Sequence, residues 1–270
     1  MIFASYPVLI RGGGDLATGV AYRLHKAGFP VMVTELERPL VVRRNVALAT
    51  AVLQGRIQIE ELHGQLVPTS DKAQQLAQQG IIPVLISPQL PADLPFSILV
   101  DARMAKRNID TQMDQADLVI ALGPGFTAGV DCHAVIETMR GHTLGRVIWH
   151  GCALPNTGTP GIVAGKGAER VLRAPVPGVV VWHKEIGDQV VTGEQLGVVS
   201  SMPVVAPFAG VVRGLIASGT AVAAGLKIGD IDPRNDRAAC FTISDKALAV
   251  GGGVLEAILT WLNRKAQNET

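Results

Sequence analysis

Short apolar runs alternate with amphipathic segments over the first half of the chain. A helix ending at Gly28 is predicted, because Leu16, Val20 and Leu24 recur at helical spacing and a glycine commonly follows a helix. The runs that flank it are brief and rich in β-branched residues, which is typical of buried parallel strands. Such strands are predicted at 7–11, 31–34, 82–86, 97–101 and 117–122. This alternation predicts an α/β, Rossmann-like N-terminal domain with a parallel sheet.

The second half of the chain contains an internal repeat with an offset of 32 residues. The segment Ala174–Val180 aligns with Ala206–Val212, and nine positions of the two copies are identical in register. Each copy alternates strand, turn and strand, with glycines at the turns. A unit this small cannot bury its own apolar face, so the two copies are expected to pack together.

The repeat resembles the biotinyl/lipoyl type of carrier domain, a small all-β barrel-sandwich hybrid built from two interlocked halves. Such carriers present a modified lysine on the hairpin between the halves. Here that connection is Ser200–Val204, which contains no lysine. The resemblance therefore implies the fold without attached biotin or lipoate, and a role in docking or as a lid.

Three regions follow from these patterns. Residues 1–165 are predicted to form the Rossmann-like nucleotide-binding domain, 166–240 the barrel-sandwich hybrid, and 241–270 a C-terminal helix. Ser244 is a suitable N-cap for that helix. The glycines at 251–253 interrupt it, and tight packing against another backbone is favoured over a phosphate-binding turn. The domain on which the helix packs is left open.

A glycine-rich turn follows the first predicted strand. Gly12, Gly14 and Ala17 match G-x-G-x-x-A, and Glu35 ends the second strand 23 positions after Gly12. Strand, glycine turn, helix, strand and acid form the dinucleotide fingerprint in context. The turn would admit a pyrophosphate to the helix N-terminus, and Glu35 would bind ribose hydroxyls, favouring NAD or a plain nucleotide over NADP. The alternative is a Rossmann-like turn that binds nothing.

Charged residues near this turn admit two interpretations each. Asp15 lies inside the turn, where its carboxylate would face a phosphate, and we interpret it instead as the N-cap of the first helix. Arg43 and Arg44 follow the second strand closely and could bind a phosphate or carboxylate through paired hydrogen bonds. The alternative interpretation of the two arginines is a solvated basic surface.

A second glycine-rich loop, Gly123–Asp131, leaves the last predicted parallel strand, and Asp101 ends its own strand at the same edge. Two such loops at one edge would frame a single crevice. The alternatives are that Gly and Pro merely form a turn here, and that Asp101 caps the segment after its strand. Beyond the loop, either a hairpin of 133–139 with 146–150 or a helix over 131–140 is expected. The predicted cofactor-binding residues are Gly12, Gly13, Gly14, Asp15, Leu16, Glu35, Arg43, Arg44, Asp101, Gly123, Pro124, Gly125, Phe126 and Thr127.

Composition narrows the classes of partner. Lys and Arg number 24 and Asp and Glu 23, so the near-neutral chain gives no reason to expect nucleic acid. The hydrophobic fraction of 48% excludes disorder over most of the length. Neither a signal peptide nor an apolar stretch of about 20 residues is evident, so a cytoplasmic protein without a membrane segment is expected. The three scattered cysteines predict neither disulfides nor a metal site, and Cys152 is either a reactive thiol or an inert one.

Several motifs together resemble the YqeB-type proteins of the selenium-dependent molybdenum hydroxylase system, from about Val8 to Leu262. The motifs are Arg11–Gly19, Arg43–Arg44, Leu122–Asp131, Val135–Thr138, Arg140–His142, Leu144–Ile148, Pro155–Gly158 and Gly229–Arg234. The resemblance implies a maturation factor that prepares a xanthine-dehydrogenase-type client enzyme. It implies work on a molybdopterin cofactor or on selenium incorporation.

Three functions are consistent with the sequence. A maturation factor would bind a nucleotide, or a nucleotide-bearing molybdopterin, and deliver it to a molybdenum hydroxylase client. An NAD-dependent oxidoreductase would need a placed proton donor, for which His133, His142, His150 and Lys106 are candidates without a Tyr-x-x-x-Lys pair. A scaffold would bind protein only. The sequence leaves the catalytic residues, the ligand and a homo-oligomeric state open.

Overall fold

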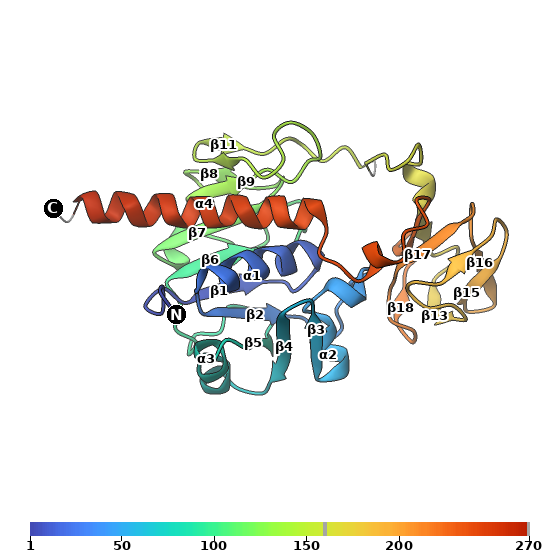
Figure 1. Ribbon diagram of the computed structural model, residues 1–270, viewed down its shortest axis with the longest axis horizontal. Helices are drawn as coiled ribbons and strands as arrows, with labels where there is room; N and C mark the ends of the chain where they lie inside the picture. Colours follow the sequence, from blue (N-terminus) through green and yellow to red (C-terminus); the bar gives the residue numbers. More distant parts are fainter. Residues whose placement is uncertain (159–160, 269–270) are drawn as a thin grey trace. The chain divides into compact units, whose positions relative to one another are not determined.

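The computed structural model describes residues 1–158 and 161–268, so the last two residues of the predicted region 241–270 lie outside the described residues. The chain divides into two compact units. The larger unit comprises Met1–Pro39, Ala47–Asn156 and Ile243–Thr270, and the smaller comprises Leu40–Val46 and Thr157–Thr242. Each unit is described by itself below (Figure 1).

The larger unit is built on a mostly parallel sheet, which confirms the predicted α/β class. Among the described residues its nine strands stand in the order β10-β9-β7-β6-β1-β2-β5-β4-β3. Their bounds are β1 Val8–Arg11, β2 Val31–Glu35, β3 Arg56–Ile59, β4 Leu62–Val67, β5 Ile82–Ile86, β6 Ile98–Asp101, β7 Leu118–Leu122, β9 Ala134–Ile136 and β10 Val147–Ile148. Only the β3–β4 and β9–β10 pairs of this sheet are antiparallel. The β9–β10 pair is the hairpin predicted for 133–139 with 146–150, so the alternative of a helix over 131–140 was wrong.

Strand β1 is the topological switch point of this sheet. Strand β1 pairs in parallel with β2 on one side and with β6 on the other, so the strands that follow are added outwards in both directions from β1. In open α/β sheets ligands bind outside the carboxyl ends of the strands at such a reversal. The fold therefore directs attention to the segments that follow β1 and β6.

Helices cover the sheet. Helix α1 (Asp15–Ala27) ends at Gly28, whose φ of 91° is the left-handed conformation expected of a C-terminal cap. Helix α4 (Asp245–Asn268) lies along α1 and also contacts β7, β9 and β10, so it belongs to the larger unit (Figure 1). Ser244 accepts a hydrogen bond from the Ala247 N–H, as an N-cap does. The unit also contains α2 (Thr50–Gln54) and α3 (Ser70–Gln78).

Glycines allow α4 to approach its neighbours closely. A Cβ at Gly251 would collide with the carbonyl oxygen of Gly19 on α1, and one at Gly253 would collide with the carbonyl oxygen of Gly145. No described atom lies within 4 Å of a Cβ placed on Gly252. The glycine run therefore serves packing at two of its three positions.

The smaller unit shows the repeat directly. Its described strands form two four-stranded antiparallel sheets, β12-β19-β17-β14 and β16-β15-β13-β18. Their bounds are β12 Val171–Arg173, β13 Gly178–Trp182, β14 Gln189–Val190, β15 Gln195–Val199, β16 Met202–Val205, β17 Gly210–Leu215, β18 Ala221–Val222 and β19 Lys227–Asp232. Strands β13, β14 and β15 begin 32 residues before β17, β18 and β19. The short strand of each copy pairs with a strand of the other copy, β14 with β17 and β18 with β13, so the two halves interlock.

The glycine run of α4 gives a test with an internal control. Gly251→Ala and Gly253→Ala are each expected to lower the free energy of unfolding by about 1–3 kcal/mol, because the methyl group overfills a backbone contact. Gly252→Ala is expected to raise it by up to about 1 kcal/mol through helix propensity. Urea denaturation measures all three. Equal effects at the three positions would contradict the packing.

Candidate functional site

The carboxyl ends of β1, β2, β6 and β7 bring most of the predicted site residues to one edge of the larger unit. Arg11, the last residue of β1, stands level with Thr34 on β2 and Asp101 on β6. Asp101 in turn stands level with Ala121 on β7. The turn at 12–16, Glu35 and the loop at 123–127 therefore follow strands that end at this one edge of the sheet.

Glu35 holds the first glycine turn in shape. One carboxylate oxygen accepts a hydrogen bond from the Gly13 N–H at 2.8 Å, and the other accepts one from the Leu36 N–H at 2.7 Å. The Gly13 carbonyl accepts a further bond from the Ala49 N–H at 2.8 Å. A Cβ at Gly13 would lie 2.7 Å from that same nitrogen, which explains why the position is glycine.

The first helix begins differently from the prediction. Gly14 is the N-cap of α1, with the extended conformation of a cap (φ −66°, ψ 179°) and no cap bond from a described side chain. Asp15 is the first helical residue, so its interpretation as the N-cap was wrong; the backbone leaves the extended conformation one residue earlier than expected. Leu16 is buried, so only its backbone faces the turn.

The cap position itself is open. Apart from Gly14 and its two neighbours in the chain, no described atom lies within 4 Å of a Cβ built on Gly14. The first N–H groups of a helix have no partner inside the helix, and they carry the positive end of its dipole. The turn therefore presents backbone donors beside free space, which is the arrangement that phosphate binding at a helix N-terminus requires.

The start of α4 adds charge to the same region of the unit. Arg140 donates both guanidinium nitrogens to the carboxylate of Asp245, at 2.9 and 3.0 Å. Burial lowers the pKa of Lys246, and the neighbouring Arg140 lowers it further, while Asp15 acts in the opposite direction. Neither Arg140 nor Lys246 was predicted as a site residue, because the contact between their segments joins positions about 105 residues apart in the chain.

A partly buried ionic cluster at the ends of β1 and β6 was also missed. The Arg11 guanidinium donates to both carboxylate oxygens of Asp110, at 2.7 and 2.9 Å. Arg103 donates to Asp101 at 2.6 Å and to Asp110 at 2.7 Å, and the Thr111 hydroxyl donates to Asp101 at 2.6 Å. The available signal was a single arginine that ends an otherwise apolar strand, since a buried charge requires a partner.

The second glycine loop is packed beneath the segment that follows β6. A Cβ at Gly125 would lie 2.5 Å from the backbone of Arg107, and the Gly125 carbonyl accepts a hydrogen bond from the Asn108 N–H at 3.0 Å. Phe126 is buried, and Gly123 packs against the side chain of Thr138. These glycines therefore make room for the protein's own chain.

Thr127 and its neighbours are joined by hydrogen bonds. The Thr127 N–H donates to Asp131 at 2.7 Å, and Asp131 also accepts from the Asn108 side chain at 3.0 Å. The Thr127 hydroxyl lies 3.3 Å from the sulfur of Cys152, which is exposed and pairs with Thr127 between the short strands β8 (Thr127–Ala128) and β11 (Gly151–Cys152). Cys132 is fully buried, and burial raises the pKa of its thiol to about 12.

Arg43 and Arg44 belong to the smaller unit and are not brought together with the glycine turns within one unit. Arg43 donates to the carbonyl of Ala239 at 3.1 Å, and Arg44 donates to that of Leu215 at 2.7 Å. Burial lowers the pKa of Arg44. The physical reason is that 40–46 leaves β2 and packs on β17, where Gly214 touches the backbone of Val42.

Other candidates have structural partners. The Nδ1 atom of His133 accepts the Val119 N–H at 2.9 Å, and burial lowers the pKa of this imidazole. Among the described residues, no group of three or more His, Cys, Asp or Glu side chains could hold a metal ion. No described helix combines the length and apolar character needed to cross a membrane.

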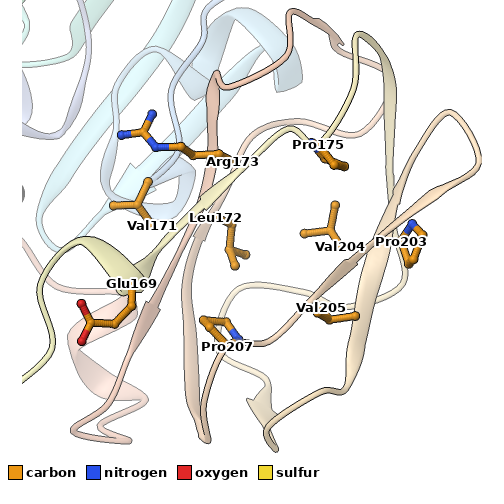
Figure 2. A pocket seen from close by; sticks show the side chains of 9 residues that line it. All are labelled: Glu169, Val171, Leu172, Arg173, Pro175, Pro203, Val204, Val205 and Pro207. Carbon is orange, nitrogen blue, oxygen red and sulfur yellow. The ribbon is translucent and has the colours of Figure 1, made fainter.

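The smaller unit has a pocket of about 240 Å³ between β12 and β16. Figure 2 shows its valine, leucine and proline lining, with Glu169 and Arg173 as the charged members. Sites for cofactor-sized ligands are commonly 300–1,000 Å³. The pocket is therefore smaller than most sites of that kind.

Comparison with known proteins gives one strong sequence relative. The chain is 48% identical over 259 residues to the uncharacterized protein YqeB of Escherichia coli K12, and the match covers 95% of this chain and 48% of that protein. The chain is thus a homologue of YqeB and spans about half its length. No protein-family model matches the chain.

Solved structures resemble the chain only slightly. An aspartoacylase family protein of Mesorhizobium loti matches with 13% identity and a TM-score of 0.28, covering 84% of this chain and 85% of that one. A succinylglutamate desuccinylase/aspartoacylase of Rhodobacter sphaeroides matches with 15% identity and the same TM-score, covering 86% and 87%. At these TM-scores neither comparison establishes a shared fold.

The ionic cluster predicts a pH-dependent stability. The Arg11 guanidinium lowers the pKa of Asp110 from its ordinary 3.8 to about 2. A carboxylate with a lowered pKa stabilises the fold above its unfolded pKa, and this contribution is lost as the pH falls through 4 towards 2. Because Asp110 is half-exposed, solvent screening limits the contribution to about 1 kcal/mol or less.

Urea denaturation of the wild type and Asp110→Asn between pH 7 and pH 3 measures this contribution. The wild type is expected to be the more stable at pH 5–7, and the difference should shrink as the pH falls. A difference that stays constant with pH would contradict the assigned ion pair.

Proposed function

We propose that the larger unit binds a nucleotide, or a molybdopterin cofactor that carries one, and that the protein is an accessory factor for a molybdenum hydroxylase client. The observation that carries this proposal is the open N-cap of α1 at Gly14, beside the topological switch point of the sheet. The resemblance of the sequence motifs to the accessory proteins of that enzyme system supplies the client.

The turn is suited to a phosphate in three respects. It follows β1 directly, so it lies at the edge where ligands bind in open α/β sheets. Gly14 leaves space next to the first backbone N–H groups of a thirteen-residue helix. Glu35 fixes the turn through Gly13 while remaining partly exposed, so its carboxylate remains accessible to ribose hydroxyls.

Turnover by an NAD-dependent oxidoreductase has weaker support. A proton donor must be positioned at the reacting group. The Nδ1 atom of His133 is already bound to a backbone N–H of β7, and no observation places the remaining candidates at the turn. A binding and delivery role needs no such group, and we therefore favour it.

Binding at the turn is tested by Gly14→Asp. The backbone at Gly14 has a conformation open to any residue, and aspartate is a favourable N-cap, so the variant should fold with unchanged or raised stability. Its carboxylate would repel a phosphate at the same place, so affinity should fall at least tenfold. Thermal shift and calorimetry with NAD, NADH, NADP, ATP, CTP and GTP measure both effects.

Gly14→Asn is the matched control, since it caps the helix with a side chain of the same size and no charge. We expect Gly14→Asn to bind the nucleotide that raises the melting temperature of the wild type clearly better than Gly14→Asp does. Equal losses in the two variants would indicate steric blockage alone. A wild-type protein that melts cooperatively and is shifted by none of the nucleotides would contradict the proposal and favour a protein-binding scaffold.

A further inference from the structure

Segment 102–111, which follows β6, lies between the two glycine loops; we name it the strap. A Cβ at Gly12 would lie 3.0 Å from the Cα atom of Arg103, and one at Gly125 would lie 2.5 Å from that of Arg107. Both glycines have positive φ, at 88° and 104°. The strap thus occupies the edge at which the sequence predicts a ligand crevice.

The carboxylate of Asp110 binds the C-terminal end of the strap to Arg11. The Asp110 carboxylate accepts hydrogen bonds from both terminal nitrogens of Arg11 and from one of Arg103, so three N–H donors converge on its two oxygens. The Arg11 side chain is 2% exposed and that of Asp110 is 44% exposed. The guanidinium is therefore almost fully enclosed, whereas its carboxylate partner is partly open to solvent.

This arrangement of donors suits an oxyanion from solution as well as it suits Asp110. Arginine binds carboxylate and phosphate through the same pair of parallel N–H···O bonds. If Asp110 moved away, Arg103 would keep Asp101 as its partner, through bonds from Nε at 3.1 Å and Nη2 at 2.6 Å. The two terminal N–H groups of Arg11 would then be available to the anion that replaced Asp110.

The strap is also strained, as a segment that must open would be. Met104 and Lys106 have φ values of 55° and 61°, in the left-handed region that side chains other than those of glycine, asparagine and aspartate seldom adopt. Such strain persists only where the surrounding structure enforces it. Asn108, two residues before Asp110, anchors the same end of the strap through side-chain bonds with Thr111 and Asp131.

We propose that Arg11 and Arg103 form a second anion site, for a phosphoryl group, that Asp110 occupies in the absence of ligand and releases when the strap opens. The site lies at the carboxyl ends of β1 and β6, next to the glycine turn. The inference deepens the proposed function by assigning a second contact for a polyphosphate ligand, and in that respect rests on it. The self-occupied site itself is defined by the ionic cluster alone.

Competition between Asp110 and the ligand gives the test. Inorganic pyrophosphate is titrated into the full chain by calorimetry at low salt. Asp110→Asn removes the competing charge and is expected to tighten binding about tenfold, which corresponds to about 1.4 kcal/mol. Asn108→Ala loosens the strap without touching either arginine, and it should tighten binding in the same direction because more of the protein is competent to bind.

Two controls separate the site from net charge. Asp114→Asn removes an exposed carboxylate outside the cluster and should leave the affinity within twofold of the wild type. Arg11→Met keeps the volume of the buried side chain, and Asp110 retains Arg103 as a partner. In the Arg11→Met background, Asp110→Asn should no longer tighten binding.

The proposal is overturned if Asp110→Asn and Asn108→Ala bind pyrophosphate no better than Asp114→Asn does, or if the gain survives Arg11→Met. Hydrogen exchange gives a second readout, since pyrophosphate should increase exchange in the strap. Unchanged or slower exchange in the strap at saturating pyrophosphate would also overturn it.

The failures of the two proposals are distinguishable. A pyrophosphate response without any nucleotide binding would remove the proposed function and leave the second anion site. Nucleotide binding that depends on Gly14 but is unaffected by Asp110→Asn and Asn108→Ala would support the proposed function and remove the second anion site.

Discussion

The arrangement of the larger unit's ligand edge depends on one constraint: the central strand ends in a buried arginine. Strand β1 has a neighbour on each side, so Arg11 has little access to water at its end. A charge removed from water is tolerated only when it is paired and hydrogen-bonded. Asp110 supplies that pairing from a segment that must cross the edge of the sheet to reach Arg11.

Glycine makes the rest of this arrangement sterically feasible. Gly12 and Gly125 let the strap lie close over both loops, and Gly13 lets the chain at Ala49 approach the first turn. Elsewhere in the unit, Gly251 and Gly253 bring α4 against its neighbours. The high glycine content therefore serves backbone contacts at several places, and Gly14 differs from these positions in facing open space.

Much of the fold could be predicted because its signals are local or periodic. The alternation of apolar runs and the G-x-G-x-x-A turn identified a parallel sheet with its first helix, and the 32-residue repeat matched the strands of the smaller unit. The site was predicted only in part. Strand ends identified Glu35 and Asp101 because parallel strands share an edge.

The ion pairs of the larger unit could not be predicted, because they depend on the path of segments that have no periodic sequence pattern. The pairing of Arg11 with Asp110 spans 99 residues, and that of Arg140 with Asp245 spans 105. Nothing near Arg43 in the sequence indicates that 40–46 leaves the larger unit. The error at Asp15 was of another kind: the position of a cap depends on backbone torsion, which a single residue type does not determine.

The central claim is that a phosphate-bearing ligand binds at the turn before α1. Amide NMR of the full chain with ¹⁵N-labelled glycine tests it most directly, since glycines are spread through both units. During titration with the nucleotide that gives the largest thermal shift, the account predicts saturating changes at Gly12, Gly13 and Gly14, with Gly219 and Gly225 unchanged. Saturable changes confined to glycines of the smaller unit, with the turn unaffected, would contradict it.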